Sequence, residues 1–532
     1  MRFSTLIIFQ KIGFIFRKFS VFLVILSISI GIFISESIFA EPIKNHTIHL
    51  SASQLAGKIR SRELTSEEVV KAFLDQIKLK NPSINAIVTI NENAIEEAKE
   101  ADRELLSGKI RGTLHGVPIL VKDSYKTKGI KTTAGYLPFK DFIPEDDAVA
   151  VRLLKQSGAI IIGKGNLATL AMDMQCNNDV FGVTNNPHDL TRTPGGSSGG
   201  DAAAVASEMV PLGFGSDLAG SIRLPASFTG VYGFKPSFNV ISMIGHIPPL
   251  PDEINGIHNL AVLGPIANNV NDLELAFTVL TNPNEKDKST IPLVHLMESQ
   301  KQKVNIKNLR IAWTDELGGV PVQAEIKEKV KEFVGRLKEA GAVVKKVEPT
   351  DFDYNKAWST WGGIVGHQGG YDRSNFMRSV GDYFTSSARK GIPMQDQIVG
   401  PISVPQYMTL IGIQKELVTQ MDNFLQDYDM WIVPVSSTTA FKHHSWSRQF
   451  GHFNVYDKPI SVDGLEVPYY TATQSYTTLF TVTENPVISM PIGIDSNQLP
   501  IGVQLVGRRY SDFQLLESAK HIEPFRSLKN KK

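Results

Sequence analysis

Apolar positions along the chain fall into two alternating patterns, helical spacing and short continuous runs. Helical spacing at 69–77 and a charged amphipathic segment at 92–106 predict helices. Continuous apolar runs at 116–121 and 430–433 predict short buried strands. Because helices and strands of this kind alternate along most of the chain, we predict an α/β fold, with a mixed sheet covered by helices on both faces.

The first forty residues have the pattern of a secretory signal peptide. Basic residues precede an apolar stretch at 21–34, and Ala40 precedes a plausible cleavage point. This stretch is shorter than the roughly 20 residues of a membrane-spanning helix. We therefore predict a signal peptide at 1–40, export to the periplasm or the exterior, and a catalytic domain at 41–532 without stable membrane insertion. An uncleaved anchor stays open, because 6–16 is also apolar.

Composition narrows the function classes. The 532 residues are 42% hydrophobic, enough for a large core, and their number allows about three domains or one domain with insertions. The net charge is +1 and no basic block occurs, so we predict no nucleic-acid partner. Cys176 is the only cysteine and is interpreted as a packing residue. Neither His443, His444 nor another histidine stands at metal-ligand spacing, so we expect no metal and no cofactor.

Two serine–glycine segments, 195–200 and 216–223, indicate nucleophilic catalysis. Ser197 and Ser221 each lie beside glycine turns, whose backbone N–H groups can receive an oxyanion. Upstream, Lys122 follows the apolar run that predicts a buried strand. Burial lowers the pKa of a lysine, so Lys122 is a candidate base. A surface ion pair between Lys122 and Asp123 is the competing interpretation.

Taken in order, these segments resemble the amidase signature family. Lys122 precedes Ser197 by 75 residues, and Ser197 precedes Ser221 by 24, spacings like those of that family. The segments 233–236, 263–266, 485–491 and 499–507 resemble its continuation. The resemblance covers nearly the whole chain after the signal segment. It implies a single large α/β domain around a mixed, twisted central sheet.

The resemblance also implies roles for individual residues. Lys122, Ser197 and Ser221 would form a Ser–cis-Ser–Lys triad, with a cis peptide bond before Ser197. Ser221 would attack the amide carbonyl, Ser197 would bridge, and neutral Lys122 would act as the base. The oxyanion hole would be formed by the backbone N–H groups of Leu218, Ala219, Gly220 and Ser221. The supporting residues would be Ser198, Asp217 and Arg223.

Two residues depart from the family pattern. Ala219 stands where the family usually has glycine, so a positive φ there would strain the loop and reshape the oxyanion hole. Asp201 stands where the family often has a small residue, and an acidic residue in the first turn favours the start of a helix.

These observations predict an exported amidase that hydrolyses a small carboxylic amide through a seryl acyl-enzyme, and they leave a homodimer open. One alternative is a protein like the A-type subunit of glutamyl-tRNA amidotransferase, against which the signal peptide argues. Another is a catalytically degenerate secreted binding protein, which only Ala219 supports. The motif G-x-S-x-G at 195–199 would fit a nucleophile elbow, but a loop-like segment precedes it. Candidate pocket walls are Met172, Phe181, Trp358, Trp361 and Tyr371.

Overall fold

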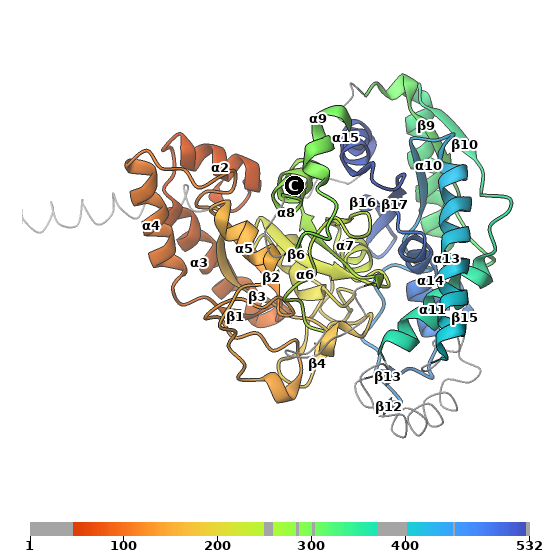
Figure 1. The fold of residues 1–532 in the computed structure, drawn as a ribbon, viewed down its shortest axis with the longest axis horizontal. Helices are drawn as coiled ribbons and strands as arrows, with labels where there is room; N and C mark the ends of the chain where they lie inside the picture. Colours follow the sequence, from red (N-terminus) through yellow and green to blue (C-terminus); the bar gives the residue numbers. More distant parts are fainter. Residues whose placement is uncertain are drawn as a thin grey trace, which may run out of the picture. The chain divides into compact units, whose positions relative to one another are not determined.

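An eleven-stranded mixed sheet lies at the centre of the fold (Figure 1). The computed structural model describes residues 46–248, 259–282, 287–300, 304–369, 402–450 and 453–527. Across the described sheet the strand order is β1-β3-β2-β6-β8-β7-β16-β17-β11-β9-β10. Strand β2 pairs in parallel with β3 and β6, whereas the pairs from β6 to β11 are antiparallel. The predicted single large α/β domain with a mixed sheet is confirmed.

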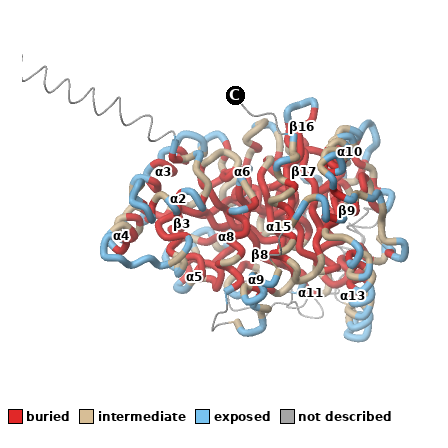
Figure 2. The backbone as a smooth tube through the Cα atoms, turned by 90° about the horizontal axis from the view of Figure 1, so that it is seen from above, coloured by how far each residue is buried: buried red, intermediate tan, exposed pale blue. Residues whose placement is uncertain are grey.

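The strands of this sheet are mostly buried along their whole length. In chain order they are β1 (Ile87–Ile90), β2 (Pro118–Lys122), β3 (Ile160–Gly165), β6 (Leu212–Asp217), β7 (Tyr232–Lys235), β8 (Val262–Ala267), β9 (Arg310–Trp313), β10 (Val343–Lys346), β11 (Met430–Pro434), β16 (Val487–Ile494) and β17 (Pro500–Val506). Three two-stranded ribbons lie outside it, β4–β5 (Asn177–Asn178 and Gly182–Val183), β12–β13 (Arg448–Phe450 and Phe453–Val455) and β14–β15 (Ile460–Val462 and Leu465–Val467). Figure 2 shows the buried residues concentrated in the sheet and in the helix faces against it.

The described helices are α2 (Ala52–Arg60), α3 (Ser66–Ile84), α4 (Ala94–Leu106), α5 (Val149–Gln156), α6 (Gly199–Ala206), α7 (Arg223–Thr229), α8 (Val270–Leu280), α9 (Met297–Gln300), α10 (Ala324–Glu339), α11 (Tyr354–Gly369), α13 (Val404–Leu425), α14 (Tyr469–Val482) and α15 (Asp512–Ile522). The two segments predicted as helical, 69–77 and 92–106, correspond to α3 and α4. Ser51 and Thr65 start α2 and α3 with reciprocal capping boxes, which satisfy N–H groups that a helix end leaves open.

Helices cover both faces of the sheet, as two neighbouring residues of β7 show. A side chain at Gly233 would meet Ala226 of α7, whereas the ring of Phe234 packs 5.0 Å from that of Phe277 on α8. Successive side chains of a strand point to opposite faces, so α7 and α8 lie on opposite sides. The helix α6 packs beside α7, and α15 beside α8.

The segment predicted as a signal peptide, residues 1–40, lies outside the described residues, so that prediction stands untested. Contacts group 51–532 as one unit, and 1–50 as a separate one. Within the described part of the chain, no helix combines the length and the apolar character needed to cross a bilayer.

Candidate active site

Lys122 lies at the end of β2 and is fully buried. Its Nζ lies 2.7 Å from Ser197 Oγ, 2.9 Å from Ser198 Oγ and 3.0 Å from Ser216 Oγ. Burial lowers the pKa of Lys122 to about 8. The alternative of a surface ion pair between Lys122 and Asp123 is wrong, because Lys122 is fully buried and its Nζ contacts the three serines, whereas Asp123 accepts hydrogen bonds from Thr133. The structure therefore surrounds a lysine of lowered proton affinity with three hydroxyl groups.

Ser197 lies in the loop that leads into α6, and its Gly196–Ser197 peptide bond is cis, as the resemblance implied. A side chain at position 196 would approach the backbone of Gln175 to 2.7 Å, so this close contact requires glycine. The last strand before Ser197 ends at Val183, fourteen positions upstream. The nucleophile-elbow interpretation is therefore wrong, because the elbow requires a strand that runs directly into the serine.

Ser221 lies two positions before the first residue of α7, and the backbone N–H of Ser198 donates to the Ser221 carbonyl at 3.1 Å. This bond ties the loop of Ser197 to the loop of Ser221. Ser221 is 5% exposed, whereas Ser197 and Lys122 are 0% exposed. Within the described residues, the Oγ of Ser221 makes no hydrogen bond. The last link of the proton relay, from Ser221 to Ser197, is therefore a proposal.

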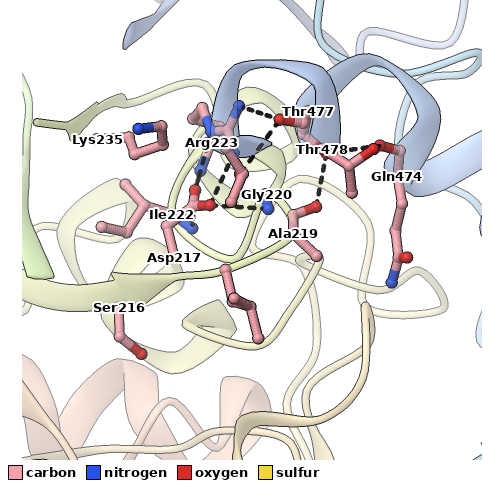
Figure 3. Close-up of polar contacts among 12 residues, drawn as sticks. Ser216, Asp217, Ala219, Gly220, Ile222, Arg223, Lys235, Gln474, Thr477 and Thr478 are labelled. Atoms are coloured by element: carbon pink, nitrogen blue, oxygen red, sulfur yellow. Dashed lines mark hydrogen bonds and ion pairs between the residues drawn. The ribbon is translucent and has the colours of Figure 1, made fainter. Parts of the chain in front are cut away.

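Asp217 and Arg223 fix the loop that carries Ser221 (Figure 3). Both are fully buried and form an ion pair of 2.7 Å. Burial alone would raise the pKa of Asp217, but the Arg223 guanidinium lowers this pKa to about 2. Arg223 also donates to the Thr477 carbonyl and to Gln504 Oε1, at 2.7 and 2.9 Å. The two residues join β6, α7, α14 and β17 around the loop.

The predicted oxyanion hole needs one correction, at Gly220. Its backbone N–H donates to Asp217 Oδ1 at 2.8 Å, and this bond removes it from the free donors. The candidate donors that stay are the N–H groups of Leu218, Ala219 and Ser221. The Leu218 carbonyl accepts from Trp361 Nε1 at 3.1 Å, which holds this turn from the side of α11.

The expected strain at Ala219 is also wrong. Positive φ occurs at Gly220, where φ is 112°, and Ala219 is absent from the described residues with positive φ. Its carbonyl accepts a hydrogen bond from Thr477 Oγ1 at 2.6 Å. The only sequence support for a degenerate binding protein therefore disappears.

We expect Gly220→Ala to disable the site. The positive φ strains alanine, and the added Cβ would lie 2.6 Å from Thr477 Oγ1. We expect a loss of about 2 kcal/mol in unfolding free energy and about a 100-fold loss of activity. Urea unfolding and turnover measure the two effects. Gly464→Ala is the matched control, because its φ of 85° is also positive but its Cβ would meet open space. Equal effects of the two substitutions would contradict the role of the Thr477 contact.

Sequence reasoning missed the polar side chains that complete the site. Ser216 on β6 contacts Lys122, and Thr477 on α14 contacts the loop of Ser221. The signal that could have found them is the density of hydroxyl residues in 469–482, since that helix is almost wholly buried. Buried hydroxyl groups need partners, which here include the catalytic loops.

The predicted pocket walls divide into three groups. Trp361 holds the Leu218 turn, and Trp358 donates to the Ser475 carbonyl on the neighbouring helix α14 at 3.0 Å. Met172 packs in a hydrophobic cluster with Leu170, and Phe181 is half-buried. Tyr371 lies outside the described residues.

The cysteine and the histidines considered from the sequence take no part in the candidate site. Cys176 is buried, and desolvation raises the pKa of its thiol to about 12, so it is unsuited as a nucleophile. His443 contacts Asn185 Oδ1 at 3.0 Å. Among the described residues, no group of three potential ligands could hold a metal ion.

Comparison with known proteins finds a matching family, relatives that align over most of their length, and similar solved structures. The pattern of the family described as Amidase matches residues 68–516. An A-type subunit of glutamyl-tRNA(Gln) amidotransferase from Clostridium acetobutylicum is 31% identical over 90% of this chain and 99% of its own. The corresponding A-type subunit from Agathobacter rectalis is 30% identical over 90% and 94%. The structure of a fatty acid amide hydrolase superposes with a TM-score of 0.75 at 25% identity, covering 91% of this chain and 86% of that one.

Proposed function

The chain belongs to the amidase signature family of amide C–N hydrolases, and from this premise we propose that it cleaves a carboxamide through an acyl-enzyme on Ser221. The observation that carries the proposal is the environment of Lys122. This amine is buried, its pKa is lowered to about 8, and it lies 2.7 Å from Ser197. A lysine in that state can accept a proton near neutral pH.

The proposed reaction moves one proton back and forth. Lys122 takes a proton from Ser197 as Ser197 takes one from Ser221, whose Oγ bonds to the amide carbon. The resulting oxyanion accepts hydrogen bonds from the candidate donors, the N–H groups of Leu218, Ala219 and Ser221. The proton then returns to the departing nitrogen, the C–N bond breaks, and an ester stays on Ser221. Water adds by the same relay, and the carboxylic acid leaves.

A second candidate function follows from the curated relatives. Those at 30–31% identity are described as A-type subunits of glutamyl-tRNA(Gln) amidotransferase, and they favour this function over that of a free-standing amidase. The amide nitrogen would then pass to an acceptor rather than be lost to water. Partner subunits and a tRNA would join the small-molecule amide, in contrast to the partners predicted from composition.

A two-part assay separates the candidates. Purified protein is incubated with a mixed library of amides, including glutamine, and products are followed by mass spectrometry with Ser221→Ala as the blank. Turnover by the chain alone supports a free-standing amidase. In the second part, the protein is treated with a fluorophosphonate. Covalent labelling of Ser221 without turnover of any amide supports a protein that needs partner chains. Absence of both would contradict the proposed acyl-enzyme.

We also propose that residues 1–40 direct export. The support is the sequence alone, a basic start, an apolar stretch and small residues before Glu41. Intact mass of the protein from its producing cell is the test, and we expect a chain that begins at Glu41. A chain that keeps Met1 and stays inside the cell would contradict export and remove the objection to the amidotransferase candidate.

A further inference from the structure

A buried carboxyl group near the site has no role in the reaction described above. Asp201 in the first turn of α6 is fully buried, and neither of its carboxyl oxygens has a hydrogen-bond partner among the described residues. By contrast, Asp512 is equally buried but accepts bonds from the backbone and hydroxyl of Ser237, at 2.8 and 2.6 Å. An unpartnered buried carboxyl costs stability, and no side chain caps the start of α6, so helix capping does not explain Asp201.

Sheet register places this carboxyl beside the strand of Lys122. A Cβ at Gly165 would lie 2.5 Å from Asp201 Oδ1, and Gly165 is the residue of β3 paired with Lys122. On the other side, a Cβ at Gly213 of β6 would lie 3.3 Å from Asp201 Cβ. The carboxyl therefore lies on the face of β3-β2-β6 that α6 covers. Lys122 points to the same face, because its partner Ser198 precedes α6 directly.

Asp201 and Lys122 influence each other electrostatically, whereas the other charged groups nearby have partners of their own. Lys164 on β3 interacts with Asp123, and Asp217 on β6 is paired with Arg223 of α7. The neighbouring strands β1 and β8 carry no titratable side chain. The hydrogen bonds of Lys122 within the described chain all go to hydroxyl groups. Among the described residues, the other titratable groups that act on Lys122 or Asp201 include Lys164, Asp123, Asp217 and Cys176, and Asp201 in turn raises the pKa of Tyr125.

We propose that Asp201 is a positioning residue that acts through Lys122 and sets the lower pH limit of the reaction. This inference rests on the proposed function, because it assumes that Lys122 is the base. Burial raises the pKa of the Asp201 carboxyl well above its usual value, and the charge of Lys122 lowers it again. Once ionised, this carboxyl favours the protonated form of Lys122, which cannot accept a proton from Ser197. Burial lowers the pKa of Lys122, and the Asp201 carboxyl is the largest influence that raises it again.

The substitution Asp201→Asn removes the charge and keeps the shape. Without the carboxyl, Lys122 binds its proton more weakly and is neutral at lower pH. The acidic limb of the pH profile therefore moves to lower pH, by about one unit for a nearby opposite charge. Asp201→Ser is the second variant, in case the amide of asparagine disturbs the packing against Gly165.

The experiment follows the labelling rate of Ser221 by a fluorophosphonate against pH. In this reaction Ser221 Oγ forms a bond to phosphorus, fluoride leaves, and the serine proton passes towards Lys122, so no substrate need be known. The pH at which the acidic limb of the labelling rate falls does not depend on the fraction of folded protein. Asp272→Asn is the control, because Asp272 is a buried carboxyl that holds the N–H groups of Ala52 and Ser53.

Three outcomes are distinguishable. The inference is supported if the acidic limb of the labelling profile shifts to lower pH in Asp201→Asn or Asp201→Ser and does not shift in Asp272→Asn. Wild-type labelling at Ser221 with the same limb in both Asp201 variants overturns the inference and leaves the proposed function intact. No labelling of folded wild-type protein overturns the proposed function and the inference with it.

Discussion

Ser221→Ala is expected to lower amide turnover by about 10⁶-fold, the largest effect of any single substitution in this chain. The Ser221 hydroxyl is the nucleophile that forms the proposed ester. Without it, only substrate binding and oxyanion stabilisation are left to accelerate the reaction. The change removes one oxygen from a residue that is 5% exposed, and we expect the folded state to persist. Turnover and fluorophosphonate labelling measure the loss, and thermal unfolding checks the fold.

The matched control for this prediction is Ser227→Ala. Ser227 is also 5% exposed and lies on α7, six positions after Ser221. We expect near wild-type turnover from this variant. If Ser221→Ala kept turnover within tenfold of the wild type, Ser221 would not be the nucleophile.

Lys122→Met is expected to lower turnover by about 10⁴-fold, the upper range for loss of a general base. Methionine keeps the apolar stem of Lys122 but cannot accept the proton of Ser197. In the wild type, turnover is expected to rise about tenfold per pH unit below about pH 8 and to level off above it, because neutral Lys122 becomes the main form there. Initial rates measured across this range test both statements.

Lys235→Met serves as the control for a buried lysine in general. Burial lowers the pKa of Lys235 to about 7, but its Nζ contacts the Pro236 carbonyl instead of the serines. We expect this variant to keep the shape of the pH profile. The same loss of the acidic limb in both variants would show that Lys122 is not the titrating base.

The lowered pKa of Lys122 also makes the unfolding free energy depend on pH. Its pKa is about 8 in the folded protein and 10.5 in the reference state, so the unfolded chain binds more protons between these values. The resulting penalty, about 3 kcal/mol, is present in full below pH 8 and disappears as the pH rises to 10.5. The wild type should therefore gain stability relative to Lys122→Met over this window, as urea unfolding at each pH would show. A difference that does not change with pH would contradict the lowered pKa.

The triad residues could be predicted because each stands in a local pattern. The apolar run before Lys122 gives a buried strand, and the glycines around Ser197 and Ser221 allow tight turns. The positions of Asp217 and Arg223 relative to Ser221 were equally readable from the family resemblance. Their ion pair then follows from the short turn between β6 and α7.

Other features of the site could not be predicted because they join distant segments. Thr477 reaches the loop of Ser221 across more than 250 positions, through the packing of α14 on that loop. The sequence also could not tell whether Ala219 or Gly220 takes the positive φ, because glycine permits such a conformation without requiring it.

The sequence by itself determined the α/β class of this protein and the three residues proposed to carry its chemistry, because burial and turn formation depend on neighbouring residues. Only the tertiary structure decided that the Gly220 N–H donates to Asp217 and that Lys122 contacts three hydroxyl groups. It also decided that Asp201 lies beside the strand of Lys122 with no hydrogen-bond partner among the described residues. Hydrogen bonds and electrostatic fields depend on distances of a few ångströms. Such distances are set by sheet register and helix packing, which no local pattern specifies.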